Sequence, residues 1–404
     1  MNTRLYSWMV VALLWVVALL NYLDRQVIFS VFPLIRADLS ATDVQLGLLA
    51  TAFLWVYAAV SPFGGYLADR FGRRRVILAS LGVWSAVTWL TAHASNYPQL
   101  LAARALMGVS EAFYLPAALA LIADYHSERT RSLATGLHQS GLYTGIVIGG
   151  FGGGWAGQYY GWRAAFLALG LGGLVYVVIL AAALRREPAR DALPATLVSR
   201  QGLGALVASR GLMILVVANA LASVAYWCVY TWLPLYLFER FHMSLAGAGF
   251  SATFYIQAAS FAGILAGGVL ADRWSRTQPR SRLFTQSIGL AAAGPFLFLV
   301  GWTASEWVLV AALVMFGLGR GFFDCNLMPV VCQIVAPGLR ATTYGVLNLT
   351  SCLAGGVIAA AGGMLKESIG LGGALQFSGI LLAGAALLLL AVRPTGTRSG
   401  SRAL

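Results

Sequence analysis

Apolar runs of about twenty residues follow one another along almost the whole chain. A membrane-spanning helix needs about 20 mostly apolar residues. Charged and turn-forming clusters separate twelve such runs, and their continuous hydrophobicity differs from the alternating pattern of an outer-membrane barrel. We predict twelve membrane-spanning helices, at residues 7–35, 44–68, 76–95, 98–124, 131–157, 163–184, 211–238, 246–271, 283–303, 306–334, 341–365 and 371–392.

The quantity of apolar residues excludes a soluble fold. Of the 404 residues, 59% are hydrophobic and 10% are charged, whereas soluble domains carry about 25% charged residues. A single core stops growing beyond roughly 250–300 residues, so the excess must face lipid. The composition therefore indicates an all-α integral membrane protein and excludes nucleic-acid binding as its main activity. The first run, Trp8–Leu20, lacks the small-residue cleavage site of a signal peptide, and we predict a retained span.

Basic residues gather in alternate connections. The chain has 27 lysines and arginines and a formal net charge of +13, and most of them lie in the N-terminus, every second loop and the C-terminal tail. Because such residues favour the cytoplasmic side, we predict that both termini are cytoplasmic. Short loops with arginine in place of lysine favour a bacterial inner membrane. The four cysteines stand in apolar runs without ligand spacing, so we expect no metal and no cofactor.

The two halves of the chain share a related loop. Residues 65–75 read Gly-Tyr-Leu-Ala-Asp-Arg-Phe-Gly-Arg-Arg-Arg, and residues 268–276 read Gly-Val-Leu-Ala-Asp-Arg-Trp-Ser-Arg. Each copy follows the second predicted span of its half, which indicates duplication, with a binding site between two bundles. We predict an N-terminal six-helix bundle in residues 1–184, a cytoplasmic linker in 185–210, a C-terminal six-helix bundle in 211–392 and a cytoplasmic tail in 393–404.

The first copy of this loop resembles the signature loop of the major facilitator superfamily. The resemblance covers essentially the whole chain and implies the major facilitator fold, with twelve helices in two six-helix bundles, and a monomer that transports by alternating access. An aspartate followed by arginines can hold neighbouring helices together through charge-assisted hydrogen bonds. A plain cluster of orienting arginines is the alternative, and the two roles are compatible. The predicted gating residues are Asp69, Arg73, Asp272 and Arg276.

A compact set of ionisable residues stands near the centres of predicted spans: Asp24, Arg25, Arg104, Glu111, Arg320 and Asp324. Each costs at least ~2.5–3.5 kcal/mol at a span centre on insertion scales and usually marks function. Structural ion pairing is the alternative. Arg104, Gly108 and Glu111 fall on one helical stripe. We expect Arg25 and Arg104 to share one water-reachable chamber with two carboxylates, where guanidinium groups can hold an anion in bidentate geometry.

Longer motifs around these charges resemble the anion:cation symporter family. They are Asn-Tyr-x-Asp-Arg at residues 21–25, Arg-x-x-x-Gly-x-x-Glu-Ala-x-x-x-Pro at 104–116, and the stretch 128–145 that begins Glu-Arg. The resemblance implies proton-coupled symport of a small organic anion, such as a sugar acid or a similar carboxylate. It makes Arg25 and Arg104 anion ligands, and Asp24 and Glu111 proton-coupling sites.

Other residues resemble the spinster branch of lysolipid carriers, namely Asp-x-Gln-Leu-Gly-Leu-Leu at 43–49 and Ala-Asp at 123–124. The second hypothesis is therefore export of a lysolipid, another amphiphile or a drug. A third is a receptor without turnover, although the chain has no sizeable soluble output domain. Because it lacks a nucleophile elbow, a phosphate loop and a metal cluster, we predict that it is not an enzyme.

Further substrate contacts are predicted from spacing and from side-chain chemistry. Asn21 shares a helix face with Arg25, and two tyrosines lie four residues apart in the seventh span. A packed histidine and an interfacial aromatic belt are the alternatives. The glycines at 141, 145, 149 and 153 are interpreted as a helix-packing stripe. The additional binding candidates are Asn21, His138, Gln139, Tyr226, Tyr230 and Asn348.

Overall fold

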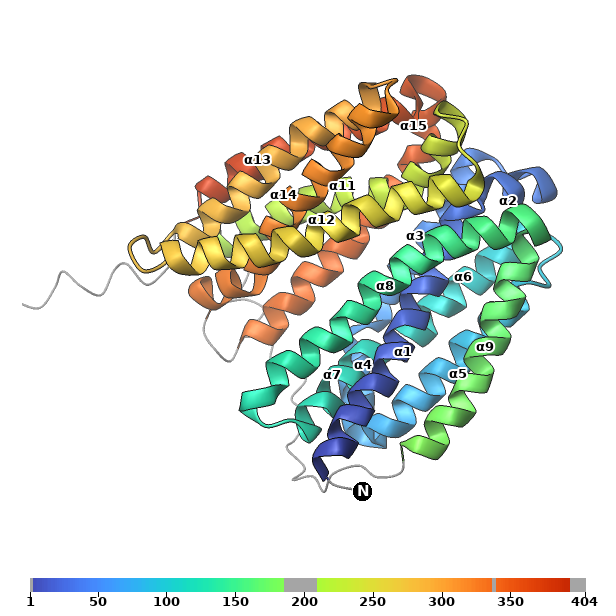
Figure 1. Cartoon of the computed structure of the whole chain (residues 1–404), viewed down its shortest axis with the longest axis horizontal. Helices are drawn as coiled ribbons and strands as arrows, with labels where there is room; N and C mark the ends of the chain where they lie inside the picture. Colours follow the sequence, from blue (N-terminus) through green and yellow to red (C-terminus); the bar gives the residue numbers. More distant parts are fainter. Residues whose placement is uncertain (1–2, 185–208, 336–338, 393–404) are drawn as a thin grey trace, which may run out of the picture. The chain divides into compact units, whose positions relative to one another are not determined.

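Figure 1 shows the computed structural model, which describes residues 3–184, 209–335 and 339–392. These residues form helices and connections and contain no strand, which confirms the all-α prediction. Most of the predicted linker and the whole predicted tail lie outside the described residues.

The first six predicted spans all fall on helices, and three of them are each divided in two. Pro33 and Pro62 stand in the first turn of the helix that follows a break, where proline's missing N–H costs no hydrogen bond. A third division follows Glu111. The helices are α1 (Thr3–Ser30), α2 (Phe32–Leu39), α3 (Asp43–Val60), α4 (Pro62–Phe71), α5 (Arg73–Thr91), α6 (Tyr97–Glu111), α7 (Tyr114–Tyr125), α8 (Glu128–Tyr160) and α9 (Trp162–Ala183).

The last six predicted spans fall on five longer helices. The chain bends at Gly370, whose φ of 72° lies in the left-handed region, and this bend coincides with the predicted boundary between the last two spans. Glycine adopts that conformation without a steric penalty. The helices are α11 (Arg210–Arg240), α12 (Leu245–Trp274), α13 (Ser281–Trp302), α14 (Glu306–Ile334) and α15 (Arg340–Leu390).

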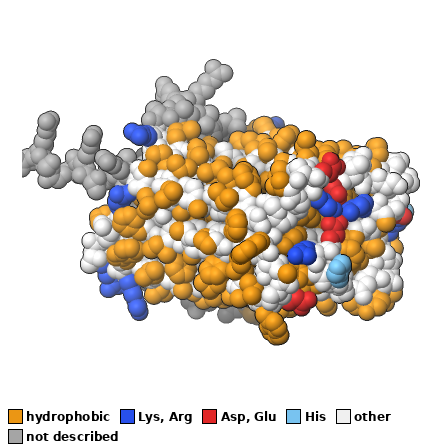
Figure 2. Space-filling view, turned by 90° about the horizontal axis from the view of Figure 1, so that it is seen from above, with side chains coloured by type: hydrophobic (Ala, Val, Ile, Leu, Met, Phe, Trp, Pro, Cys, Tyr) orange, Lys and Arg blue, Asp and Glu red, His pale blue; other side chains and the backbone are white. Residues whose placement is uncertain are grey.

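Nine segments of the described chain are long and apolar enough to cross a membrane, so this is a multi-pass membrane protein. The segment Thr342–Leu390 counts once although Gly370 bends it. The helices α5 and α8 are not among the nine, because α5 begins with three arginines and α8 is rich in glycine and polar residues. Hydrophobic side chains cover much of the face drawn in Figure 2, and charged ones gather toward its ends. Twelve spans in two six-helix bundles remain a prediction.

The described chain divides into two compact units. The first holds residues 3–184 together with Leu233–Thr253, and the second holds the remaining described residues. Leu233–Thr253 joins the first unit through its own contacts. Glu239 accepts a hydrogen bond from Arg36 Nη2 at 2.9 Å, and a Cβ built at Gly150 would lie 2.6 Å from the carbonyl oxygen of Gly249.

Helices α1 and α8 run side by side in the first unit (Figure 1). A Cβ built at Gly141 would lie 2.7 Å from the Trp15 carbonyl oxygen, and one at Gly149 would lie 2.8 Å from that of Leu23. The glycine stripe of α8 therefore lets the backbone of α1 approach closely, which confirms the packing interpretation. This contact leaves another face of α1 to meet α5 and α6.

We expect Gly145→Ala to destabilise the protein, because the added Cβ would overlap the carbonyl oxygen of Leu19. Overpacking of this kind costs about 1–3 kcal/mol. Gly136→Ala is the matched control on the same helix, since a Cβ there meets nothing within 4 Å. Thermal unfolding in detergent measures both. Equal midpoints for the two variants would contradict the packing account.

Candidate functional site

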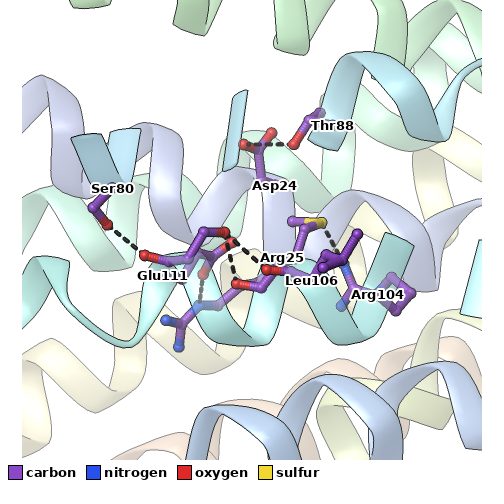
Figure 3. Close-up of polar contacts among 9 residues, drawn as sticks. Asp24, Arg25, Ser80, Thr88, Arg104, Leu106 and Glu111 are labelled. Carbon is purple, nitrogen blue, oxygen red and sulfur yellow. Dashed lines mark hydrogen bonds and ion pairs between the residues drawn. The ribbon is translucent and has the colours of Figure 1, made fainter. Parts of the chain in front are cut away.

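Four ionisable side chains meet inside the first unit (Figure 3). Asp24 and Arg25 come from α1, and Arg104 and Glu111 come from α6. Asp24 is 2% exposed, whereas Arg104 and Glu111 are fully buried. Electrostatic interactions connect Asp24 with both Glu111 and Arg104. The predicted stripe on α6 and the charged end of α1 are thus brought together, and we call these four residues the charged cluster.

The closest contact in the charged cluster joins Arg25 to Glu111. Arg25 Nε donates to Glu111 Oε2 at 2.5 Å. Asn21 is 2% exposed and lies next to Glu111. However, Asn21 Nδ2 and Glu111 Oε1 complete no hydrogen bond of normal geometry with a described residue. Glu111 is therefore held mainly by one guanidinium group.

Asp24 is held more weakly than Glu111. Thr88 Oγ1 on α5 donates to Asp24 Oδ2 at 3.3 Å, and Asp24 Oδ1 has no hydrogen-bond partner among the described residues. With both acids ionised, the charged cluster carries two positive and two negative charges and is neutral as a whole. Neutrality limits the cost of burying four charges, because an uncompensated buried charge is far more expensive than a paired one.

An aromatic ring from α3 lies between the two arginines. The ring centroid of Phe53 is 4.9 Å from Cζ of Arg25 and 4.9 Å from Cζ of Arg104. The ring centroid of Tyr57, also on α3, lies 4.7 Å from Cζ of Arg25. Helix α3 reaches this position because α6 has Gly108 there, where a Cβ would lie 2.6 Å from the carbonyl oxygen of Phe53. The sequence reasoning missed both aromatics, which their four-residue spacing in the second predicted span could have indicated.

The two arginines differ in access to solvent. The Arg25 side chain is 12% exposed, and the Arg104 side chain is fully buried. Arg104 Nη1 contacts Met107 Sδ at 3.3 Å, while Nε and Nη2 have no hydrogen-bond partner among the described residues. The expectation that both guanidinium groups reach water in one chamber is therefore wrong for Arg104 in this structure, because α3 and Phe53 lie against it.

His138 on α8 is fully buried and bonded within the first unit. The hydroxyl of Tyr114 donates its one proton to the Leu14 carbonyl oxygen at 2.8 Å. The 2.9 Å contact with His138 Nε2 therefore requires that Nε2 carries a proton and donates to Tyr114. This bond ties α8 to α7 and α1. Gln139 follows on α8 and is partly buried.

The second unit contains a polar group of its own. Arg320 Nε lies 3.2 Å from Asp324 Oδ2, and the Arg320 Cζ lies 5.1 Å from the ring centroids of Tyr226 and Tyr230. Gln257, absent from the predicted set, donates through Nε2 to the Tyr230 hydroxyl at 2.9 Å. Asn348, on α15, is partly exposed.

The predicted gating residues have partners that the sequence did not indicate. Arg73, at the start of α5, donates to the Ala120 carbonyl oxygen at 2.5 Å and pairs with Asp124 at the end of α7. Asp272 pairs with Arg282 Nη2 at 3.1 Å. Asp69 and Arg276 are exposed. Within the described ranges, no group of three or more His, Cys, Asp or Glu side chains could hold a metal ion.

Comparisons with known proteins agree on one family. The family model described as Major Facilitator Superfamily matches residues 14–360. A probable galactarate/D-glucarate transporter, GudP, from Bacillus subtilis is 25% identical over 93% of this chain and 90% of its own length. A probable sulfoacetate transporter, SauU, from Cupriavidus necator is 27% identical over 90% of this chain and 84% of its own length.

Proteins of the spinster type are also similar. Protein spinster homolog 1 from Xenopus laevis is 27% identical over 86% of this chain and 70% of its own length. A crystal structure of a bacterial homolog of the human lysosomal transporter spinster, in an inward-facing and occupied conformation, superposes with a TM-score of 0.82. It is 22% identical and covers 95% of this chain and 96% of that chain, so it shows the fold.

Proposed function

This chain belongs to the Major Facilitator Superfamily, and we propose that it imports a small organic anion together with protons. Membership makes it a transporter rather than an enzyme. The names of similar proteins support an anionic substrate, since GudP is named for galactarate and D-glucarate and SauU for sulfoacetate. The main structural support for this proposal is the ion pair between the partly exposed Arg25 and the buried Glu111 in the neutral charged cluster.

The substrate carboxylate competes with Glu111 for Arg25. Arg25 contacts Glu111 through Nε, and its side chain retains 12% exposure through which an anion can approach. An anion that pairs with this guanidinium leaves Glu111, which is fully buried, with an uncompensated negative charge. A buried carboxylate in that position takes up a proton rather than remain charged. Binding of the anion therefore recruits a proton.

Charge balance then couples transport to protons. The empty charged cluster is neutral, and the cluster loaded with one carboxylate and one proton is also neutral. An anion without a proton would leave one net negative charge inside the membrane, where an ion costs at least ~2.5–3.5 kcal/mol on insertion scales. Only the neutral states change conformation readily. We propose at least one proton for each substrate negative charge.

Arg104 and Asp24 have supporting roles in this proposal. Arg104 is enclosed behind Phe53, so it supplies positive potential to the anion site and becomes a direct ligand only if that ring moves. Asp24 has one oxygen without a hydrogen-bond partner in the described part of the chain, and it serves as the second proton site for a substrate with two negative charges.

The remaining predicted residues keep their roles as part of the proposal. Asp69, Arg73, Asp272 and Arg276 act in gating, in a monomer of a bacterial inner membrane with both termini cytoplasmic. Arg73 bonds to α7, and Asp272 bonds to the start of α13. Such bonds can break and re-form in each cycle. The proposed additional substrate contacts are Asn21, His138, Gln139, Tyr226, Tyr230 and Asn348.

A ligand panel separates this function from export of an amphiphile, the second hypothesis, which the resemblance to the spinster branch implies. We expect galactarate, glucarate or sulfoacetate to raise the thermal unfolding midpoint of the purified protein and to enter proteoliposomes that contain it. A lysophospholipid of matched concentration is the comparison. Stabilisation and movement by the lysophospholipid alone would contradict the anion proposal and support the amphiphile exporter.

A further inference from the structure

A groove on the first unit lies apart from the charged cluster. It measures about 550 Å³ and is formed by α4, α5 and α6. Its walls are almost wholly apolar and include Leu67, Val76, Val83, Leu106 and Val109. The side chain of Val83 is 53% exposed and that of Leu106 is 54% exposed. This surface therefore faces the surroundings of the helices rather than their interior.

The two serines of the groove are already bonded within the protein. Ser80 Oγ donates to the Ser110 carbonyl oxygen at 2.5 Å. Ser110 Oγ bonds to the carbonyl oxygens of Leu106 and Met107, each at 3.1 Å. Both hydroxyl protons are therefore used within the protein, and both side chains are almost fully buried. The body of the occupant must therefore be apolar.

Positive charge stands at one end of the groove. Arg75, which is exposed, lines the groove at the start of α5. Phe71 lines it beside the end of α4, and the Arg70 Cζ lies 5.7 Å from its ring centroid. From Arg75 to Val83 the α5 face extends about 12 Å. The groove thus presents an apolar trough that Arg75 lines at one end, with Arg70 nearby on the Phe71 ring.

We propose that this groove binds one anionic phospholipid, with an acyl chain in the trough and the phosphate beside Arg75. The positive charge of Arg75 favours a negatively charged headgroup. The length of the apolar face of α5 favours an acyl chain of many methylene groups. The groove belongs to a multi-pass membrane protein, and Arg75 belongs to the arginine-rich loop predicted to be cytoplasmic. The occupant is therefore a lipid of the inner leaflet.

Native mass spectrometry tests the proposal with the purified full chain and phosphatidylglycerol. We expect a site that binds phosphatidylglycerol about fivefold more tightly than phosphatidylcholine with the same acyl chains. Arg75→Gln should remove this preference. Arg273→Gln is the matched control, because Arg273 is an exposed arginine of the related loop in the second unit. Unchanged preference in Arg75→Gln, or equal loss in Arg273→Gln, would overturn the proposal.

Two further measurements locate the lipid and identify its class. Phosphatidylglycerol with a photoreactive acyl chain should crosslink to residues 67–83 or 106–113, and crosslinks elsewhere alone would overturn the proposal. Ala79→Trp should fill the trough and reduce this crosslinking. Crosslinking of the photoreactive lipid to the wild-type chain tests the proposal even if the Ala79→Trp variant fails to fold. If oleate competes as well as phosphatidylglycerol, the occupant is a free fatty acid and not a phospholipid. If the wild-type chain forms a dimer that Ala79→Trp abolishes, the occupant is a second copy of the chain.

Discussion

Glu111→Gln should stop net uptake of the anion while exchange across the membrane continues. In the variant, the empty charged cluster keeps Arg25, Arg104 and Asp24 and so carries one net positive charge. With a singly charged anion bound it becomes neutral without any proton, and with a doubly charged anion it becomes neutral when Asp24 takes up one proton. The loaded form can therefore change conformation, whereas the empty form must move an uncompensated buried charge. One uncompensated charge inside the membrane costs ~2.5–3.5 kcal/mol. Added to the barrier for the return of the empty carrier, this cost slows that step by roughly 100-fold.

Proteoliposomes measure both activities of this variant. Net uptake is followed into vesicles without internal substrate, and exchange into vesicles loaded with unlabelled substrate. Glu306→Gln, at an exposed position in the first turn of α14, is the matched control and should behave as wild type. Wild-type net uptake by Glu111→Gln would refute a role for this carboxyl in coupling, and loss of both activities would refute the predicted survival of exchange.

Arg25→Lys should reduce anion uptake by about 30-fold or more at low substrate concentration. The lysine keeps the charge but has no planar fork, so it cannot hold the substrate carboxylate in bidentate geometry once that carboxylate displaces Glu111. It also loses the stacking of the guanidinium on Phe53 and Tyr57. Loss of a buried charged hydrogen-bond partner typically costs 2–5 kcal/mol, and about 2 kcal/mol corresponds to a factor of about 30.

The matched control for this variant is Arg163→Lys. Arg163 pairs with Asp38 at 2.5 Å, and both side chains are about two-fifths exposed, so the pair is a surface feature. Initial uptake rates, normalised to the amount of protein in the vesicles, measure the effect. Equal rates for Arg25→Lys and the control would show that Arg25 is not the anion ligand.

The sequence revealed the charged cluster because ionisable residues stand out in apolar runs. Arg104 and Glu111 could be placed on one stripe from helical spacing alone, and the same reasoning put Asn21 and Arg25 on one face of the first span. The glycine stripe of α8 was equally readable, since close helix packing needs a regular absence of side chains. Each of these inferences depends on periodicity within a single helix.

Contacts between helices were harder to predict. The position of Phe53 between Arg25 and Arg104 depends on how closely α3 approaches Gly108, which no spacing within one helix reveals. The enclosure of Arg104 follows from the same packing. Likewise, the partner of Arg73 is Asp124, 51 residues further along the chain. Tertiary packing decides such pairs.

Proton movement during uptake is the most direct test of the charge-balance mechanism. Vesicles containing wild-type protein and an internal pH indicator receive the transported anion outside at equal pH. The account predicts internal acidification that accompanies uptake, with at least one proton for each substrate negative charge, and accumulation when the outside is made acidic. Uptake that leaves the internal pH unchanged and ignores an imposed pH gradient would contradict it.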